Sequence, residues 1–218
     1  MIELKPKFEE GYYSGLFSWE DLSSLINIRP LMTAERVYVY APEDMKFTWT
    51  NDGWALDHNC YPPTLLRELM EKYVCYFCDM SRCTEKINAF AKEVEDTYQQ
   101  HVDAHIYMCR NMDIEHPFGI HFDISDNIII QCEGKTNFKV WNEIDNSLKL
   151  YESEKNVNMT MNNDPILDVE MKPGDAIWIP KYYPHLATSR TKRLSVSFPF
   201  SKTLQKKDRD RNWVTFDD

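Results

Sequence analysis

Residues 119–130 read Gly-Ile-His-Phe-Asp-Ile-Ser-Asp-Asn-Ile-Ile-Ile, and they decide how the rest of the chain is interpreted. His121 and Asp123 stand two residues apart at the start of an apolar run. In a β-strand, side chains at positions i and i+2 point to the same side, so these two can bind one metal ion together. The stretch therefore predicts part of a metal site at the entrance to a buried strand.

A third side chain of the right type, His185, follows sixty-four residues after His121. It comes after a Pro-Gly-Asp turn at residues 173–175 and an apolar strand at 176–179, in a loop that contains two prolines. Two histidines and one carboxylate with open coordination positions are the ligand set associated with non-haem Fe(II) oxygenases. Because a His-x-Asp by itself is also common at exposed strand ends, the metal prediction depends on this third ligand.

The size and composition of the chain indicate one compact domain. Of its 218 residues, 43% are hydrophobic and 13% are aromatic. This is too apolar for a disordered chain, and the length suits one well-buried core. We therefore expect a single domain over residues 1–218, with a helix-and-strand part at about 1–100, a barrel core at about 101–200 and a short basic tail at 201–218.

The formal net charge of −10 argues against broad electrostatic binding to nucleic acid or to an anionic membrane surface. No apolar run approaches the roughly 18 residues of a membrane span. Residues 1–7 lack the apolar core of a signal peptide. These features predict a cytoplasmic protein without a membrane partner.

Six cysteines without a secretory signal predict reduced thiols. Cys75, Cys78 and Cys83, with Cys60 as a fourth ligand, form a candidate zinc cluster. However, Cys75 and Cys78 fall within an expected amphipathic helix, and a second C-x-x-C pair is missing. Buried structural thiols are therefore the preferred interpretation, and zinc is the alternative.

A short helix is expected from residue 19 to about residue 26. Ser18 can cap its N-terminus, with Asp21 at the third helical position. Phe17 and Leu22 are placed as a hydrophobic staple across this helix start.

Hydrophobic periodicity predicts the remaining elements. Apolar stripes at helical spacing run over residues 64–77 and 87–98. β-Forming residues at 36–40 predict a strand, and a turn signal predicts a hairpin over 49–54. Further strands are expected at residues 104–109, 127–132, 137–141, 166–171, 176–179 and 194–200. Helices outside such short antiparallel strands predict a mainly β fold with flanking helices, a double-stranded β-helix of the jelly-roll or cupin type.

Four motifs follow one another in the second half of the chain. They are His121-Phe122-Asp123, the strand end Gln131-Cys132-Glu133-Gly134, the basic and aromatic strand at 138–141, and the segment from Gly174-Asp175 to His185. In this order and spacing, the chain resembles the JmjC and cupin-like oxygenases that depend on Fe(II) and 2-oxoglutarate. The resemblance is strongest to the ribosomal-protein oxygenases and to the asparaginyl hydroxylase of hypoxia-inducible factor (HIF). It covers about residues 100–200 well and 17–40 more loosely.

The resemblance implies a JmjC-like fold and a hydroxylase that acts on a protein side chain or a small molecule. By motif position, His121, Asp123 and His185 would bind Fe(II) and leave three positions for bidentate 2-oxoglutarate and O₂. Asn127 matches an asparagine that lies near 2-oxoglutarate in several relatives. Some relatives hydroxylate tRNA bases, but the acidic composition makes nucleic acid the minor candidate.

The chain departs from these relatives where they bind the distal carboxylate of 2-oxoglutarate. Thr136 stands where they have lysine or arginine, and a neutral hydroxyl cannot replace a charge-assisted hydrogen bond. Lys139 should point to the opposite face of its strand, so Arg193 on the last strand is the preferred substitute. Ser197 replaces an asparagine common in that strand. The predicted co-substrate residues are thus Asn127, Thr136, Arg193 and Ser197.

Two other functions stay open. A cupin dioxygenase or isomerase could use the same three ligands without 2-oxoglutarate, and Thr136 favours this alternative. A non-catalytic cupin could instead bind a ligand or a protein partner. Neither the identity of the substrate nor the oligomeric state follows from the sequence.

Overall fold

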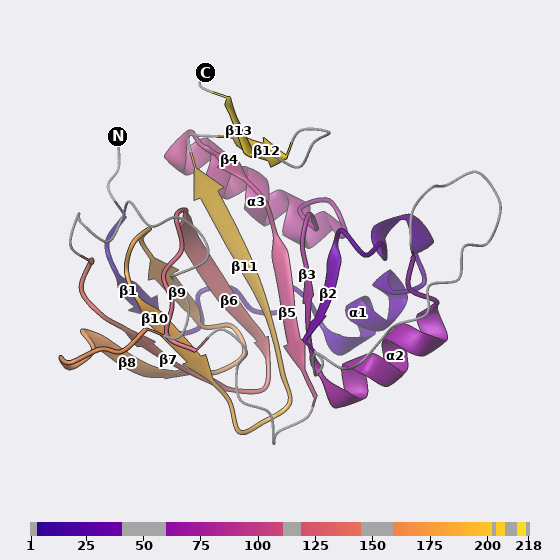
Figure 1. Ribbon diagram of the computed structural model, residues 1–218, viewed down its shortest axis with the longest axis horizontal. Helices are drawn as coiled ribbons and strands as arrows, with labels where there is room; N and C mark the ends of the chain where they lie inside the picture. Colours follow the sequence, from indigo (N-terminus) through magenta and orange to yellow (C-terminus); the bar gives the residue numbers. More distant parts are fainter. Residues whose placement is uncertain are drawn as a thin grey trace.

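The computed structural model describes residues 4–40, 60–110, 119–144 and 159–201, and the backbone of two short strands at 204–207 and 213–216. Two antiparallel sheets make up its body (Figure 1). The larger sheet runs in the order β1-β9-β6-β11-β5-β3-β2, and β4 pairs with the end of β11. Its strands are β1 (Lys7–Glu9), β2 (Val37–Tyr40), β3 (Val74–Phe77), β4 (His101–Val102), β5 (His105–Cys109), β6 (Asp126–Glu133), β9 (Ala176–Ile179) and β11 (Arg193–Ser201).

The smaller sheet has the order β10-β7-β8. Its strands are β7 (Thr136–Val140), β8 (Leu167–Met171) and β10 (His185–Thr188). Seven buried apolar side chains join it to β6 and β9 of the larger sheet: Ile129, Phe138, Val140, Met171, Ile177, Ile179 and Ala187. Two sheets that enclose a shared core form the double-stranded β-helix predicted from the sequence.

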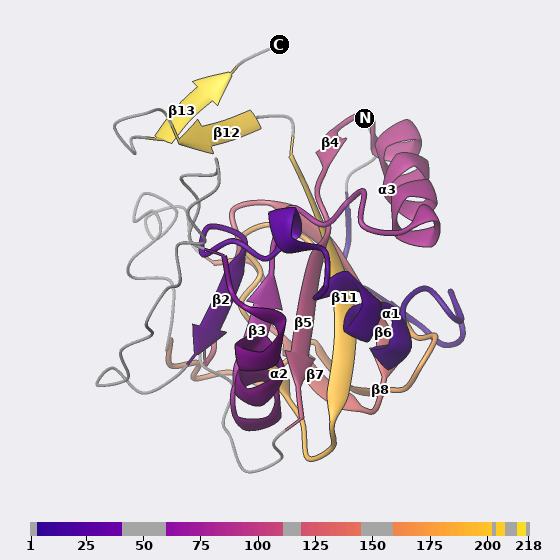
Figure 2. The same ribbon diagram turned by 90° about the vertical axis from the view of Figure 1, so that its right-hand side faces the viewer.

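Three helices cover the other face of the larger sheet (Figures 1 and 2). They are α1 (Trp19–Leu25), α2 (Pro63–Lys72) and α3 (Glu85–Tyr98), with a short 3₁₀ turn η1 (Arg29–Leu31) after α1. The predicted capping box of α1 is present, because Ser18 and Asp21 bond to each other's backbone amides. On α3, Ile87, Phe90 and Val94 enter the main hydrophobic core, as their spacing predicts.

Strand β11 has two chemically different faces. Leu194 and Val196 belong to the core under the helices. Arg193, Ser195 and Ser197 alternate with them and line a cavity inside the barrel. The helices therefore stabilise one face of β11, while its polar face is left available for a site.

The helix predicted over residues 64–77 is wrong in its second half. Helix α2 ends at Lys72, and residues 74–77 form β3 between β2 and β5. This run is apolar at nearly every position, so its pattern fits a buried strand as well as a helix stripe, and pairing on both sides decides the outcome. Cys75 thus lies in a strand and Cys78 just after it. All six cysteines are free thiols.

Besides β3, five strands were not predicted. β1, β4 and β10 are short, and β12 (Leu204–Lys207) and β13 (Trp213–Phe216) pair with each other in the segment expected to be a solvated tail. The other predicted strands are confirmed within a residue or two at their ends. The hairpin predicted over 49–54 lies outside the described residues.

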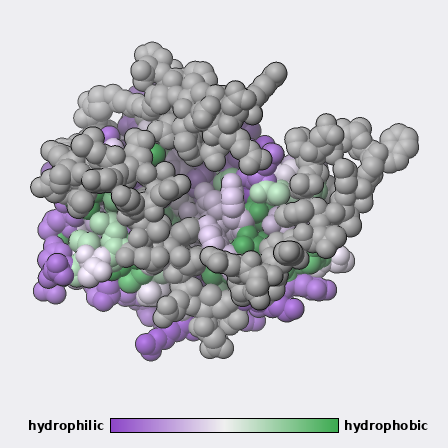
Figure 3. Space-filling model, viewed as in Figure 1, coloured by the Kyte–Doolittle hydropathy of each residue, from purple (hydrophilic) through white to green (hydrophobic). Residues whose placement is uncertain are grey.

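The described surface in the view of Figure 3 is largely hydrophilic along its outline, with hydrophobic residues in smaller patches. None of the described helices is long and apolar enough to cross a bilayer.

Candidate active site

Two histidines meet through their backbones. The His121 amide donates to the His185 carbonyl at 3.1 Å, and the His185 amide donates to the His121 carbonyl at 2.7 Å. Their imidazole centroids lie 4.3 Å apart as a result. The strand geometry assumed for the pair His121 and Asp123 is not present, since His121 forms an isolated bridge with His185, and β6 begins only at Asp126. Pairing across sixty-four residues, rather than local strand alternation, therefore assembles the site.

Asp123 completes a three-residue cluster with these histidines. Its backbone carbonyl accepts a hydrogen bond from the Tyr182 amide at 2.8 Å, and its Oδ2 lies 3.8 Å from Nε2 of His185. One ligand atom from each of the three residues lies within 4.8 Å of the other two. This is the one such group of metal-binding side chains in the described part of the chain. Two imidazoles and one carboxylate fit Fe(II), so the residues present match the predicted ion.

The hydrogen bonds of the imidazoles suit metal binding. Nδ1 of His121 lies 3.2 Å from the Gly119 carbonyl, and Nδ1 of His185 lies 3.1 Å from the Tyr183 carbonyl. A carbonyl can only accept, so each Nδ1 must carry a proton, and in a neutral imidazole the lone pair is then on Nε2. Such a contact fixes the tautomer and the ring orientation of a ligating histidine.

Burial and the neighbouring His121 lower the pKa of His185 to about 4, while Asp123 acts in the opposite direction. Because the charged imidazolium is disfavoured, His185 is neutral at pH 7. A histidine ligand must be neutral to donate its lone pair to a metal.

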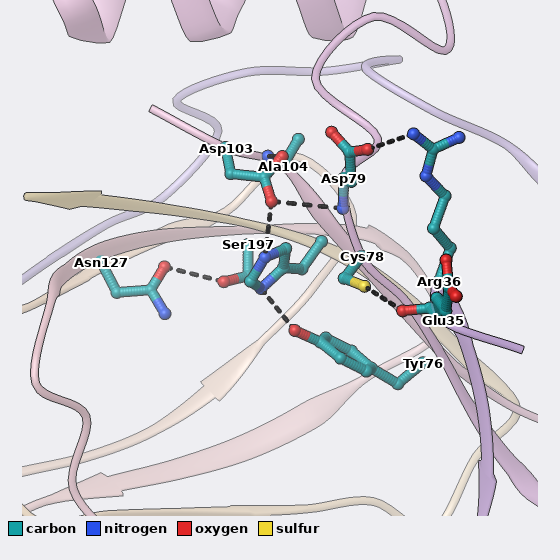
Figure 4. A network of polar contacts seen from close by, with 10 residues as sticks. Glu35, Arg36, Tyr76, Cys78, Asp79, Asp103, Ala104, Asn127 and Ser197 are labelled. Carbon is teal, nitrogen blue, oxygen red and sulfur yellow. Dashed lines mark hydrogen bonds and ion pairs between the residues drawn. The ribbon is translucent and has the colours of Figure 1, made fainter. Parts of the chain in front are cut away.

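Asn127 connects the carboxylate of Asp123 to β11. Its amide nitrogen donates to Asp123 Oδ2 at 3.4 Å, and its Oδ1 accepts a hydrogen bond from Ser197 Oγ at 2.8 Å. Both partners of the Ser197–Asn127 bond are buried, and Figure 4 shows them side by side. This arrangement gives the two residues a specific role in orienting Asp123, beyond the predicted general position near the co-substrate.

Replacing Asn127 with alanine is expected to lower metal affinity by about 10–100-fold, the range typical when a partner of a metal ligand is removed. The fold should persist, because the large apolar core is untouched. Mn(II) titration followed by electron paramagnetic resonance measures the effect. Asn137→Ala is the matched control, since Asn137 bonds to Asp168 outside the cavity. Equal affinity in the two variants would contradict this role for Asn127.

The cavity around the three ligands contains most of the predicted co-substrate residues. Asn127, Arg193 and Ser197 line it, whereas Thr136 is buried on the same face of β7 as the lining residue Phe138. The full set of lining residues is Tyr107, His121, Asp123, Asn127, Ile129, Phe138, His185, Ala187, Arg193, Ser195 and Ser197. Ser195 was missed, although the polar–apolar alternation of residues 193–198 could have indicated it.

The two lysines near Thr136 point elsewhere, as strand alternation predicted for Lys139. Lys135 pairs with Glu170 at 2.8 Å, and Lys139 pairs with Asp168 at 3.4 Å. Both pairs are at least one-third exposed and lie between β7 and its neighbour β8. Neither ammonium group therefore serves the cavity.

Tyr76 and Asp103 belong to a polar network (Figure 4). Tyr107, the cavity residue on β5, is next to this network. Tyr107 packs on Tyr76 with ring centroids 4.7 Å apart, and the Tyr76 hydroxyl lies 2.8 Å from Nδ1 of His105. The other ring nitrogen of His105 lies 2.9 Å from Asp103. Although burial raises the pKa of Asp103, its hydrogen bond with His105 contributes to a net lowering of that pKa. The network fixes the position of Tyr76 and, through ring packing, the wall of the cavity.

The described chain also has a larger hollow of about 500 Å³ beside β1, α3 and β9. Its lining includes Tyr12, Tyr98 and Trp178, with Glu93 as the one carboxylate among the described lining residues. It contains neither histidine nor cysteine within that described lining. The larger hollow therefore lacks a metal-ligand set, and the chemistry is assigned to the smaller cavity at His121.

Two facing antiparallel sheets with a His-x-Asp and a distal histidine at their opening define a cupin-type barrel with a metal-binding constellation. The chain belongs to the JmjC domain family, whose profile matches residues 69–207.

Comparisons with known proteins agree on the fold. The chain is 22% identical over 196 residues to the bifunctional lysine-specific demethylase and histidyl-hydroxylase NO66 of Drosophila persimilis, covering 89% of this chain and 27% of that protein. The Escherichia coli ycfD crystal structure matches with a TM-score of 0.60 and 16% identity, over 95% of this chain and 51% of that one. A second structure of E. coli YcfD, described as a ribosomal oxygenase in complex with cobalt and 2-oxoglutarate, matches with a TM-score of 0.58 and 16% identity. This match covers 90% of this chain and 48% of the YcfD chain. The chain thus spans about a quarter of the length of the NO66 protein and about half of the solved chains.

Proposed function

We propose that this chain is an Fe(II)- and 2-oxoglutarate-dependent oxygenase that hydroxylates a protein side chain. The observation that carries the proposal is the cluster of His121, Asp123 and His185, in which one ligand atom from each residue lies within 4.8 Å of the other two. Its donor set matches Fe(II) and leaves room for further ligands. The names of the NO66 and YcfD proteins, which refer to histidyl, lysine and ribosomal substrates, favour a protein substrate over a small molecule.

The residues of the cavity have three different roles in such a reaction: metal binding, orientation of a ligand and exclusion of water. His121, Asp123 and His185 would hold Fe(II), while Asn127 and Ser197 keep the Asp123 carboxylate in place. Ile129, Phe138 and Ala187 provide an apolar wall that excludes water from the reacting atoms. Bound iron, with O₂ and a 2-oxo acid that is decarboxylated, supplies the oxidising power for C–H hydroxylation.

The first test measures succinate formation from 2-oxoglutarate by the purified chain with Fe(II) and O₂. Succinate should form slowly alone and faster with a peptide substrate, and mass spectrometry should detect one added oxygen atom on that peptide. Histidine- and lysine-containing peptides from ribosomal proteins are the first candidates, because the names of the relatives point to histidyl, lysine and ribosomal targets.

The two alternatives predict different results. A cupin dioxygenase or isomerase would bind Fe(II) but release no succinate. A non-catalytic cupin would fail to bind Fe(II) under anaerobic conditions. Either result would reject the proposed activity.

A further inference from the structure

Arg193 is a buried cation without a counter-charge in the described structure. It begins β11, is 5% exposed and lines the same cavity as the three metal-binding residues. Its guanidinium makes no hydrogen bond or ion pair with any described side chain, whereas Arg36 and Arg110 pair with Asp79 and Glu71 near the surface. Burial lowers the pKa of Arg193, with Cys109 and Tyr107 acting in the opposite direction. A buried charge is costly unless it is paired, so this one indicates a missing anion.

The cavity does not provide that anion from its own described side chains. Asp123 is the one carboxylate among the described lining residues, and it belongs to the metal-binding cluster. The lining residues closest in sequence to Arg193, Ser195 and Ser197, are neutral. The charge balance therefore calls for a ligand that carries a carboxylate remote from the metal.

Arg193 begins β11 at the same end of the barrel at which Thr136 begins β7, so a cation on β11 can take the place of one on β7. Gly134 has a φ of +66°, and a Cβ there would lie 1.8 Å from the Lys192 carbonyl oxygen. The Lys135 amide donates to Thr191 Oγ1 at 2.8 Å in the same place. The turn before β7 thus rests directly on the segment before β11, and the two strands begin at the same end of the barrel, at Thr136 and Arg193.

Thr136 adds a second donor at this end. Its side chain is 1% exposed, and its Oγ1 has no hydrogen-bond partner among the described residues. An orphaned buried hydroxyl costs stability unless a ligand satisfies it. A ligand carboxylate could accept hydrogen bonds from both the guanidinium and this hydroxyl.

We propose that Arg193 binds the distal carboxylate of a dicarboxylic 2-oxo acid, with Thr136 Oγ1 as an additional donor. The inference rests on the proposed function and specifies its co-substrate class. A planar guanidinium can bind a carboxylate through two parallel, charge-assisted hydrogen bonds. Strand β11 thereby supplies the cation that β7 lacks, and the site selects 2-oxo acids with a second carboxylate.

The test compares two 2-oxo acids on the Mn(II)-loaded protein by isothermal titration calorimetry, without turnover. One is 2-oxoglutarate, and the other is 2-oxopentanoate, which has the same carbon chain but lacks the distal carboxylate. The unmodified protein should bind 2-oxoglutarate at least about tenfold more tightly, the size expected when a charge-assisted hydrogen bond is lost.

Arg193→Gln should weaken 2-oxoglutarate binding by about 10–100-fold and leave 2-oxopentanoate binding within about twofold. Thr136→Val should weaken 2-oxoglutarate by a smaller factor of about 3–10. Lys139→Gln, which removes a cation facing away from the cavity, is the matched control and should change neither affinity. Mn(II) affinity and melting temperature verify that each variant is folded and loaded.

Three outcomes overturn the inference. Unchanged 2-oxoglutarate affinity in Arg193→Gln removes the role of the guanidinium, and an equal loss for both acids assigns Arg193 to the fold instead. If the unmodified protein binds Mn(II) but neither acid, the proposed function fails together with the inference. If Arg193→Gln does not fold, Arg193→Lys replaces it in the test. The unmodified protein should then prefer 2-oxoglutarate to 2-oxopentanoate, and Arg193→Lys should show a smaller preference; an unchanged preference would overturn the inference.

Discussion

Replacing His121 with alanine is expected to abolish 2-oxoglutarate turnover and to lower metal affinity by more than about 100-fold. Even the loss of a residue that only supports a metal ligand costs about 10–100-fold, so the loss of a ligand should exceed that range. Only His185 and Asp123 would remain at the site, and the backbone bridge between positions 121 and 185 does not need the imidazole. Anaerobic Fe(II) titration and succinate detection by nuclear magnetic resonance measure the two effects.

The matched control for this variant is His101→Ala. His101 is exposed, and its Nδ1 lies 3.5 Å from the Glu95 carboxylate of α3. It does not belong to the residues that line the cavity. This variant should keep both metal affinity and turnover. Succinate formation that persists in His121→Ala while it depends on Fe(II) would place the metal elsewhere and refute the assignment of the site.

The grouping of His121, Asp123 and His185 could be predicted because their chemical types and order are visible in the sequence. Their geometry could not. Strand alternation was used to join His121 to Asp123, but the structure joins His121 to His185 through two long-range backbone hydrogen bonds. Such pairing depends on how the sheets close, and no local pattern encodes it. For the same reason, β10, which begins at His185, was read as a loop end.

The limits of hydrophobic periodicity appear at the end of α2. Residues 73–77 are apolar or aromatic throughout, which satisfies a helix stripe and a doubly covered strand alike. Burial of β3 between β2 and β5 resolves the choice in favour of the strand. Here tertiary pairing overrides a local preference.

The co-substrate residues show a similar division. Departure from a family pattern singled out Thr136, and strand alternation excluded Lys139; its pairing with Asp168 is consistent with that. The sequence could not predict the environment of Arg193. Its guanidinium is buried in the cavity and makes no ion pair with a side chain in the described part of the chain. The cytoplasmic location and the substrate stay predictions.

Replacing Gly134 with alanine is expected to lower the free energy of unfolding by about 2–4 kcal/mol, a loss typical of a substitution at a strained and sterically closed position. Gly134 has a φ of +66°, in the left-handed region that disfavours residues with a Cβ. Moreover, the added Cβ would lie 1.8 Å from the Lys192 carbonyl oxygen and 2.9 Å from its carbonyl carbon. Both contacts are with backbone atoms, so the segment before β11 must move. Chemical denaturation followed by circular dichroism measures the loss.

Gly11→Ala separates the two contributions, because Gly11 has a similar φ of +63° but nothing within 4 Å of the added Cβ. This control should lose only about 1 kcal/mol, the cost of a left-handed alanine. The difference between the variants then measures the clash alone. Since the clash displaces Lys192, the neighbour of Arg193, Gly134→Ala should also weaken 2-oxoglutarate binding more than 2-oxopentanoate binding, whereas Gly11→Ala should affect neither. Equal losses of stability in both variants would show that the contact between the β7 turn and the β11 segment is loose, and that Arg193 does not depend on it for its position.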